Sequence, residues 1–502
     1  MVDGSRVTGE RMEQDRRTYK VVRLLTGGVT PVVLAAGLLV YARWHDPSWE
    51  AAPQAAGICR ELIAGTTEGR QALFGSCWSA PLPVLFYLPF AWLLPEPAAG
   101  WAAFFCAWLF VFWAVREAVK STGQSGWRIV LAQAAIAAMM AVSGCPQALR
   151  AATALTAGLS LLAAAGLADW AAYRRLRDVV STGSAGALLL LCGFPAFGPA
   201  ALAVAALPLA ACGHRETRSR AQAWLLLGGL PPVYAFGVWM LLNRLVLGDP
   251  LFFVRSLGHL VPDAGLFLAA LALPALALLP ALLAVWILDG RSEKPGAGAA
   301  GASAMLVALA VAWLATDAVL VSYRIGWCGV TLRVCALSVL MIALARLKQP
   351  LYRLALSFGL FVWMSVFWFR EAAPDERSET GRGDLCREVE SYVNARTPYG
   401  RVFVLGYAGL DLLRGCRSER LVANLDLHVG SLRRAYKGQN LYVLVPEPVG
   451  ATRAESVFWR YPDIYTRGSE RLLFARAFGN WHLFEVVTAP TQEQLDEWRR
   501  AR

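Results

Sequence analysis

The sequence predicts a mostly α-helical, polytopic membrane protein with a smaller α/β domain at its C-terminal end. Hydrophobic residues make up 57% of the 502 residues and charged residues only 17%, whereas soluble chains carry about 25% charged residues. The apolar residues also gather in runs close to the ~20 residues that a membrane helix needs. The composition turns polar only after Arg370, where the second domain is expected to begin.

The net charge of +12 does not indicate nucleic-acid binding. The Lys and Arg residues stand in short clusters between apolar runs, without a basic stripe that interleaves aromatic residues. Such clusters are typical of the loops that orient membrane helices. We therefore expect membrane lipid, and no nucleic acid, as the surroundings of this chain.

The N-terminal tail, residues 1–23, is polar and charged. No small-residue cleavage site follows the first apolar run, so we expect a retained anchor and a cytoplasmic tail. The membrane domain is predicted to occupy residues 24–370 with about 11 spans. The expected span cores are 24–42, 101–115, 128–142, 150–168, 180–195, 197–212, 222–245, 265–288, 303–321, 329–346 and 352–369.

The run 81–97 (PLPVLFYLPFAWLLPEP) is ambiguous, because its prolines argue against one continuous helix. If it does not cross, the inner loops after residue 100 hold fourteen Lys and Arg and the outer loops hold five. A crossing would reverse that positive-inside bias. We therefore expect 81–97 to dip into the outer leaflet, with the N-terminus cytoplasmic and the C-terminus external.

The C-terminal stretch, residues 371–502, is predicted to be an external α/β domain that follows a polar linker. Its expected helices are 385–395, 409–415 and 454–461. Its expected strands are 401–406, 420–428 and 440–446, with a closing hairpin over 471–487.

Six of the ten cysteines fall on the side predicted to be external. An even number of cysteines in an oxidising compartment suggests disulfides, although free thiols remain the alternative for each pair. The expected pairs are Cys59–Cys77, Cys145–Cys328 and Cys386–Cys416.

The first outer loop, residues 43–100, is the longest loop of the membrane domain. Asp46 and Glu50 follow the first apolar run directly, in YARWHDPSWEA (residues 41–51). Further along, VWMLLNRLVLGDPLFFVRS (residues 238–256) leads a span into another outer loop. Carboxylates at the lip of a membrane are candidates for general-base chemistry.

These stretches resemble the GT-C superfamily of integral-membrane glycosyltransferases, which includes the protein mannosyltransferases and the aminoarabinose lipid A transferases. Its members have an acidic residue after the first span and a proline- and aromatic-rich run before a second crossing. Many also carry an Asn and a Gly-Asp-Pro pattern like residues 243–252 here, and an external α/β tail.

The resemblance implies a glycosyltransferase at the external face of a bacterial cytoplasmic membrane. Its donor would be a sugar on polyprenyl phosphate, and its acceptor a lipid, a glycan or a protein. Asp46 would be the general base, with Glu50 or Asp249 as a second carboxylate. The donor phosphate would be held by Arg150, Arg244, Arg255 and Arg324, and the substrate pocket lined by Trp49, Trp78, Asp249 and Tyr323.

The second outer loop departs from the superfamily pattern, since it offers Gln147 and Arg150 where many members have an acid. A divalent metal held by paired acids is therefore in doubt, and no metal site is predicted. Histidines and cysteines also lack the spacing of metal ligands.

Structural roles stand beside these functional ones. Asp46 can cap a helix that starts at Pro47, with Glu50 as its first-turn partner. Arg244 and Arg255 can extend to lipid headgroups, and Asp317 can pair with Arg324. At the level of function, the alternatives are a non-catalytic GT-C-like scaffold in envelope glycan assembly and a transporter. The latter is disfavoured because polar residues gather at the outer rim and not at the midplane.

Overall fold

A computed structural model describes the chain in separate stretches between residues 24 and 487. The described residues are 24, 28–45, 50–75, 81–120, 126–142, 146–193, 196–211, 220–252, 262–268, 297–323, 327–346, 382–397, 399–414, 416, 418, 420–425, 427, 432, 436, 439–449, 452–453, 455–469 and 471–487.

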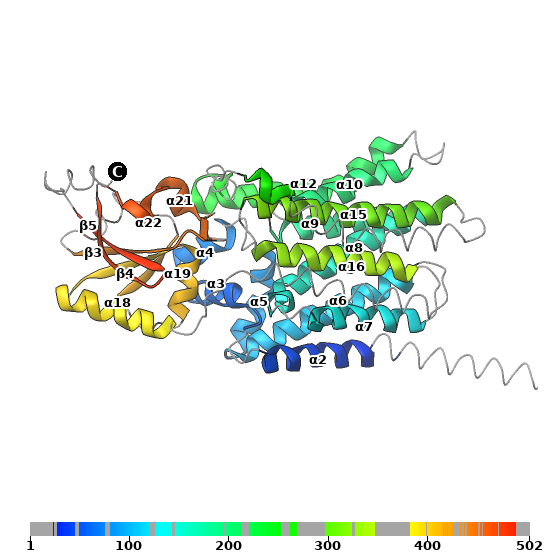
Figure 1. Ribbon diagram of the computed structural model, residues 1–502. Coiled ribbons are helices and arrows are strands. Elements are labelled where there is room, and N and C mark those ends of the chain that lie inside the picture. Colours follow the sequence, from blue (N-terminus) through cyan, green and yellow to red (C-terminus); the bar gives the residue numbers. More distant parts are fainter. Residues whose placement is uncertain are drawn as a thin grey trace, which may run out of the picture.

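The first part of the described chain is a bundle of long helices that run side by side (Figure 1). They are α2 (Thr30–His45), α6 (Ala98–Lys120), α7 (Gly126–Val142), α8 (Ala151–Tyr173), α9 (Leu176–Leu190), α10 (Phe197–Ala211), α12 (Ala221–Leu247), α15 (Ala297–Ser322) and α16 (Trp327–Arg346). Among the described helices, those long and apolar enough to cross a membrane are α6, α8, α12 and residues Met305–Ser322 of α15.

The centre of the bundle is α8, which contacts α6, α9, α10, α15 and α16. It is rich in Ala and Gly, and small residues let helices approach closely in membranes. A Cβ at Gly158, for example, would come within 2.5 Å of the Phe110 ring of α6. A larger residue there would push these two helices apart.

The outer face of the bundle exposes many apolar side chains. Soluble proteins rarely expose a continuous apolar surface of this kind to water. On α12, Tyr234 is 73% exposed and Leu245 71% exposed, and α2 exposes Val33 and Val40. Lipid is the solvent that suits such a face, so the predicted fold class, a membrane helical bundle, is confirmed. The greater part of predicted span 265–288 and all of 352–369 lie outside the described residues.

The ambiguous run 81–97 forms a short helix, α5 (Pro81–Leu93), which ends just before Pro95. Its 13 residues span about 20 Å at 1.5 Å per residue, less than the ~30 Å hydrocarbon core. That it dips into the outer leaflet without crossing stays a prediction. Together with α3 (Pro53–Ile63) and α4 (Thr67–Gly75), it lies between the bundle and the C-terminal domain (Figure 1).

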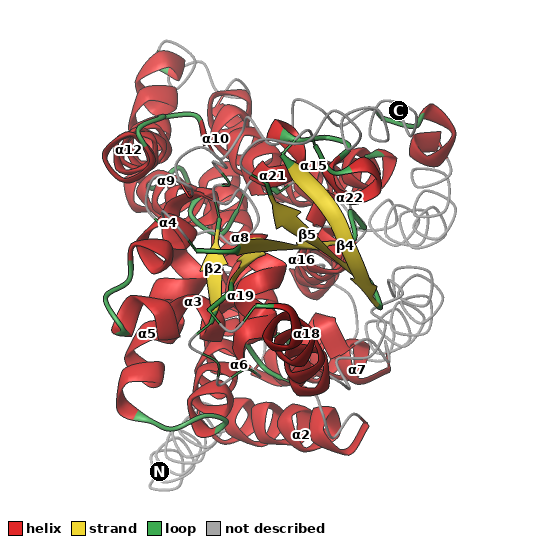
Figure 2. Cartoon of the chain, turned by 90° about the vertical axis from the view of Figure 1, so that its left-hand side faces the viewer, coloured by secondary structure: helices red, strands yellow, loops and turns green. Residues whose placement is uncertain are grey.

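The C-terminal domain is a mixed five-stranded sheet with helices on both faces (Figure 2). The strand order is β2-β1-β3-β5-β4, where β2, β1 and β3 are parallel and β5 is antiparallel to both β3 and β4. The strands are β1 (Arg401–Leu405), β2 (Leu421–Asn424), β3 (Leu441–Pro446), β4 (Leu472–Phe478) and β5 (Trp481–Val486); the helices are α18 (Arg382–Arg396), α19 (Gly406–Arg414), α21 (Ser456–Arg460) and α22 (Ile464–Arg467).

The two faces of the sheet pack against different helices. Val402 and Val404 of β1 share a core with α18 and α19, whereas Phe403 and Leu405 pack with α21 and α22. Strands covered on both faces are apolar throughout, which is why β1 and β3 were recognisable in the sequence. Every helix, strand and hairpin predicted for this domain is confirmed within a few residues.

Candidate functional site

A pocket lies where the membrane domain, the first outer loop and the C-terminal domain meet. It encloses about 390 Å³ of empty space, including its open mouth. Its walls come from the start of the first loop, from α3, α5 and the beginning of α6, and from the end of α19. The lining residues are Glu50, Ala51, Ala52, Ala56, Tyr87, Glu96, Pro97, Gly100, Trp101 and Arg414.

The charged centre of the pocket is Arg414, which contacts two carboxylates. Its Nη1 lies 2.5 Å from Oε2 of Glu50, and its Nη2 lies 3.5 Å from Oε1 of Glu96. The Arg414 side chain is only 11% exposed, whereas Glu50 is 37% and Glu96 56% exposed. The guanidinium is therefore the buried member of the cluster, and the carboxylates reach toward solvent.

Glu50 does not have the capping role that the sequence suggested for it. Residues 50–52 are not helical, and α3 begins at Pro53 with Ala52 as its N-cap. The capping interpretation of Glu50 is therefore wrong. The carboxylate is instead held by an arginine 364 positions further along the chain.

The aromatic wall of the pocket is formed by Tyr87 of α5 and Trp101 of α6. Tyr87 is only 3% exposed, yet it lines the pocket. Arg43, at the end of α2, lies 5.9 Å from the centre of the Trp101 ring. Such a wall suits the apolar face of a sugar ring or the first carbons of a lipid chain.

The second outer loop is joined to the first loop beside this pocket. The amide of Ala151 donates to the carbonyl of Ala51 at 3.0 Å, and Trp108 of α6 donates through Nε1 to the carbonyl of Leu149 at 3.2 Å. Arg150 directly precedes α8 and is half-buried. The structure thus brings the backbone of predicted phosphate ligand Arg150 next to that of Glu50.

The Asn and Gly-Asp-Pro stretch, residues 243–252, lies beside α4 of the first loop and contacts it. Asn243 and Trp239 of α12 both donate to the carbonyl of Phe74 in α4, at 3.0 Å and 2.9 Å. Gly248 ends α12 with φ +77°, and Asp249 accepts a bond from the amide of Leu251 at 3.1 Å. These contacts explain why the stretch needs these residue types.

The predicted site residues of this stretch lie apart from the pocket walls. Arg244 is exposed and donates to the carbonyl of Gly248 at 2.5 Å, so it caps its own helix. Asp249 forms the turn that follows. Neither residue lines the pocket, and neither does half-buried Tyr323, which directly follows α15.

Several predicted residues lie outside the described part of the chain, so their roles remain predictions. These are Asp46, Trp49, Cys77, Trp78, Cys145, Arg255 and Arg324, together with the side chain of Cys328.

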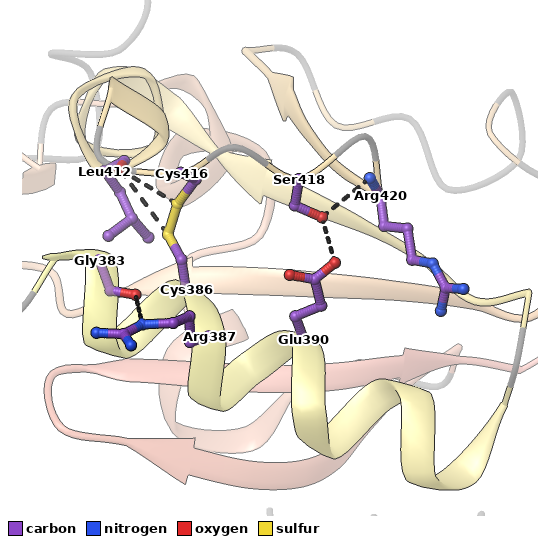
Figure 3. The surroundings of a disulfide bond; sticks show 8 residues. All are labelled: Gly383, Cys386, Arg387, Glu390, Leu412, Cys416, Ser418 and Arg420. Carbon is purple, nitrogen blue, oxygen red and sulfur yellow. Dashed lines mark hydrogen bonds between the residues drawn. A yellow bond between two sulfur atoms is a disulfide. The ribbon is translucent and has the colours of Figure 1, made fainter.

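The predicted Cys386–Cys416 disulfide is present (Figure 3). It joins α18 to the residue two positions beyond Arg414, with the two Cα atoms 5.9 Å apart. Cys59, in contrast, is a buried free thiol whose Sγ donates to the carbonyl of Val84 at 3.4 Å. The predicted Cys59–Cys77 bridge is therefore not formed, because Cys59 is used as core filler.

Asp317 has a different partner from the one the sequence suggested. Its Oδ2 lies 2.8 Å from Nε of Arg333 in α16, and both side chains are buried in the bundle. Pairing with Arg324 had been expected because the two are close in sequence. Arg333 lies within the second turn of α16, one helix away from Asp317.

In the part of the chain that the structure describes, no three His, Cys, Asp or Glu side chains gather as metal ligands would. In the pocket, the negative charges of Glu50 and Glu96 are balanced by the guanidinium of Arg414.

Comparison with known proteins gives only structural similarities. No family model and no curated protein matches the chain. It is similar to two crystal structures of ArnT from Cupriavidus metallidurans, one bound to undecaprenyl phosphate and one in the apo state. Both are 14% identical to it, with TM-scores of 0.47 and 0.38, and each match covers 92% of this chain and 99% of ArnT.

ArnT is an aminoarabinose lipid A transferase of the GT-C superfamily, which is the kind of protein that the sequence motifs resemble. At this identity and these TM-scores, the likeness assigns no activity to this chain.

Sequence reasoning missed four side chains that shape the pocket: Tyr87, Glu96, Trp101 and Arg414. Tyr87 and Glu96 stand inside the loop already singled out, where the prolines on either side of Glu96 mark a tight turn. Arg414 carried no local signal, since an arginine at the end of a short helix is ordinary helix chemistry.

Proposed function

We propose that the protein is a membrane glycosyltransferase that uses a polyprenyl-phosphate-linked sugar at the external face of the membrane. The observation that carries this proposal is the pocket at the junction of bundle and C-terminal domain. It places the carboxylate of Glu50, an aromatic wall and a guanidinium within one cavity, directly after the first membrane helix.

The chemistry needs few groups. The donor already holds a phosphate leaving group, so the protein must remove a proton from the acceptor hydroxyl and stabilise the phosphate. The acceptor oxygen then bonds to the anomeric carbon while the bond from that carbon to the phosphate oxygen breaks. The proton passes to a carboxylate, Asp46 or Glu50, and the polyprenyl phosphate leaves.

The surroundings of the pocket support a lipid-borne substrate. The end of α5 exposes Trp92 and Leu93, a pattern typical of side chains at a membrane surface. Polyprenyl phosphate carries its charge at that depth. Arg414 lines the pocket, Arg43 contacts its Trp101 wall, and Arg150 stands before α8 beside the first loop. Among these cations we assign phosphate binding to Arg150.

The external orientation is supported by two independent features. The distribution of Lys and Arg over the loops favours it. The Cys386–Cys416 disulfide of the C-terminal domain also favours it, because such bonds persist in oxidising compartments and are rare in the cytosol.

The test is the loss of a glycan in cells. Asp46→Asn and Glu50→Gln are expressed in a strain that lacks the chromosomal copy, and the envelope glycans and lipids are profiled by mass spectrometry. We expect a modification present with the wild-type protein to be lost with Asp46→Asn at unchanged protein level. Arg387→Gln, a change in an exposed ion pair of α18, is the control and should leave the profile intact.

An unchanged profile with both carboxylate variants would refute catalysis and favour the scaffold. Cysteine labelling that places residues 43–80 in the cytosol would also refute the proposal.

A further inference from the structure

The position of Arg414 in the pocket is fixed by three contacts of the helix that carries it. At the N-terminal end of α19, Glu455 accepts a bond from the amide of Ala408 at 3.1 Å. In the first half of the helix, Tyr407 and Leu410 contact the first loop. At the C-terminal end, Cys416 is tied to Cys386.

The N-terminal contact requires glycine. Gly406 has φ +75°, and a Cβ there would overlap the carboxylate of Glu455. The buried carboxylate therefore occupies the space in which any other residue would place its side chain. This arrangement sets the direction in which α19 leaves β1.

The contacts with the first loop set the distance between the domains. The hydroxyl of Tyr407 donates to the carbonyl of Ala72 in α4 at 3.1 Å. A Cβ on Gly57 of α3 would lie 3.3 Å from Cδ of Arg414 and 3.4 Å from the carbonyl oxygen of Leu410. Gly57 thus lets α19 lie close enough for Arg414 to reach past α3 into the pocket.

The geometry points to Arg414 as a positioning residue of the active site, supplied by the C-terminal domain. Resting on the function proposed above, we infer that Arg414 fixes the Glu50 carboxylate in the pocket by binding it and Glu96 at once. The C-terminal domain then completes a site whose other walls belong to the membrane domain. Sugar transfer depends on Arg414 through Glu50.

A guanidinium suits this task better than an ammonium. Its planar fork offers separate N–H groups to two acceptors at fixed angles, whereas lysine offers one point charge. Nη1 faces Glu50 and Nη2 faces Glu96, so each carboxylate uses a different nitrogen. Lysine would keep the positive charge, but it would not offer a separate nitrogen to each carboxylate.

The experiment measures transfer kinetics in membrane vesicles from a strain without the chromosomal copy. The donor probe is the total radiolabelled polyprenyl-linked sugar fraction extracted from the parent strain. The acceptor is the one already present in the membrane vesicles. We expect Arg414→Gln to lower kcat by about 10- to 100-fold, the cost of a slightly misplaced group. KM for the donor fraction should change less than about threefold, since the substrate contacts remain. Arg414→Lys should fall between Arg414→Gln and wild type.

The double variant separates positioning from other roles. Because Arg414 acts through Glu50, Glu50→Gln/Arg414→Gln should be no slower than Glu50→Gln alone. Arg387→Gln again serves as the matched control, with wild-type rates expected. If Arg414→Gln fails to accumulate, Arg414→Lys replaces it: the kcat of Arg414→Lys is compared with wild type, and that of Glu50→Gln/Arg414→Lys with Glu50→Gln.

Three outcomes overturn the inference. Wild-type kcat in Arg414→Gln, beside an active wild-type protein, refutes the role of Arg414 and leaves the proposed function standing. A double variant much slower than Glu50→Gln shows that Arg414 acts independently of Glu50. Absence of any transfer by wild-type vesicles refutes the proposed function, and the role of Arg414 with it.

Discussion

Asp317 and Arg333 form an ion pair inside the helical bundle, with 2.8 Å between Oδ2 and Nε. The pair joins α15 to α16 where neither side chain reaches solvent. Charges within a membrane domain are costly unless they are paired, so this contact constrains how the two helices pack.

Removal of one partner of this pair should destabilise the bundle. We expect Arg333→Leu to lower the free energy of unfolding by about 3–5 kcal/mol, because it leaves Asp317 buried without its counter-charge. The thermal unfolding midpoint of the purified protein in detergent micelles measures this. The double variant Asp317→Leu/Arg333→Leu should recover most of the loss, and a midpoint as low as that of the single variant would contradict the explanation.

Asn243 should stabilise the first loop more than the bundle. Asn243→Leu removes the bonds to the carbonyls of Phe74 and Trp239, at a cost of about 1 kcal/mol. We expect faster amide exchange over α4 in hydrogen–deuterium exchange, with α8 unchanged. Leu241→Val on the lipid-facing side of α12 is the control. Equal exchange in α4 for both variants would show that Asn243 does not hold the loop.

Loss of the Cys386–Cys416 disulfide should loosen the C-terminal domain. The bond closes a loop with a sequence separation of 30, and loop-closure entropy gives a stabilisation of about 3–4 kcal/mol. We expect Cys386→Ser/Cys416→Ser to be cleaved sooner by protease between β1 and β2 than the wild-type protein. Cys106→Ser, which removes a free thiol of α6, should behave as wild type. A double variant as resistant as wild type would argue against this stabilisation.

Glu455 should make the stability of the C-terminal domain depend on pH. Burial is the main cause that raises the pKa of its carboxyl from 4.5 to about 8. The folded state therefore holds a proton that the unfolded state releases above pH 4.5. This contribution to stability is full below the unfolded pKa and is lost as pH rises through 8, by at most about 1.4 kcal/mol per pH unit.

The comparison of Glu455→Gln with wild type isolates this effect. The amide keeps an acceptor for Ala408 without titrating. Between pH 5 and pH 8, the unfolding midpoint of the wild type should therefore fall relative to that of the variant. The difference between the two midpoints is the quantity to measure by differential scanning fluorimetry. A difference that stays constant over this range would show that Glu455 does not titrate there.

The pattern of the sequence was sufficient for most secondary structure. The apolar runs predicted the long helices of the bundle, namely α2, α6, α7, α8, α9, α10, α12, α15 and α16, since length and hydrophobicity are local properties. The strands β1 and β3 and the hairpin of β4 and β5 were predicted from local patterns for the same reason. The helix α5 was not predicted, because the prolines of residues 81–97 argued against one continuous helix, yet Pro89 lies inside it.

Long-range pairing was beyond such patterns. The sequence suggested Arg324 for Asp317 and Cys77 for Cys59 because these residues are close along the chain. The structure pairs Asp317 with Arg333 across two helices and uses Cys59 as a buried thiol. Which side chains meet depends on helix rotation and packing, which are set by the whole bundle.

By itself, the sequence determined that this chain is a membrane bundle with an α/β domain, and it singled out the loop after the first apolar run because Asp46 and Glu50 stand in it. Only the tertiary structure decided that Glu50 faces Arg414, because their meeting depends on how α19 packs against α3. Hydrophobic periodicity is a property of residues close together in the sequence, whereas a contact between positions 50 and 414 forms only when the two domains pack together.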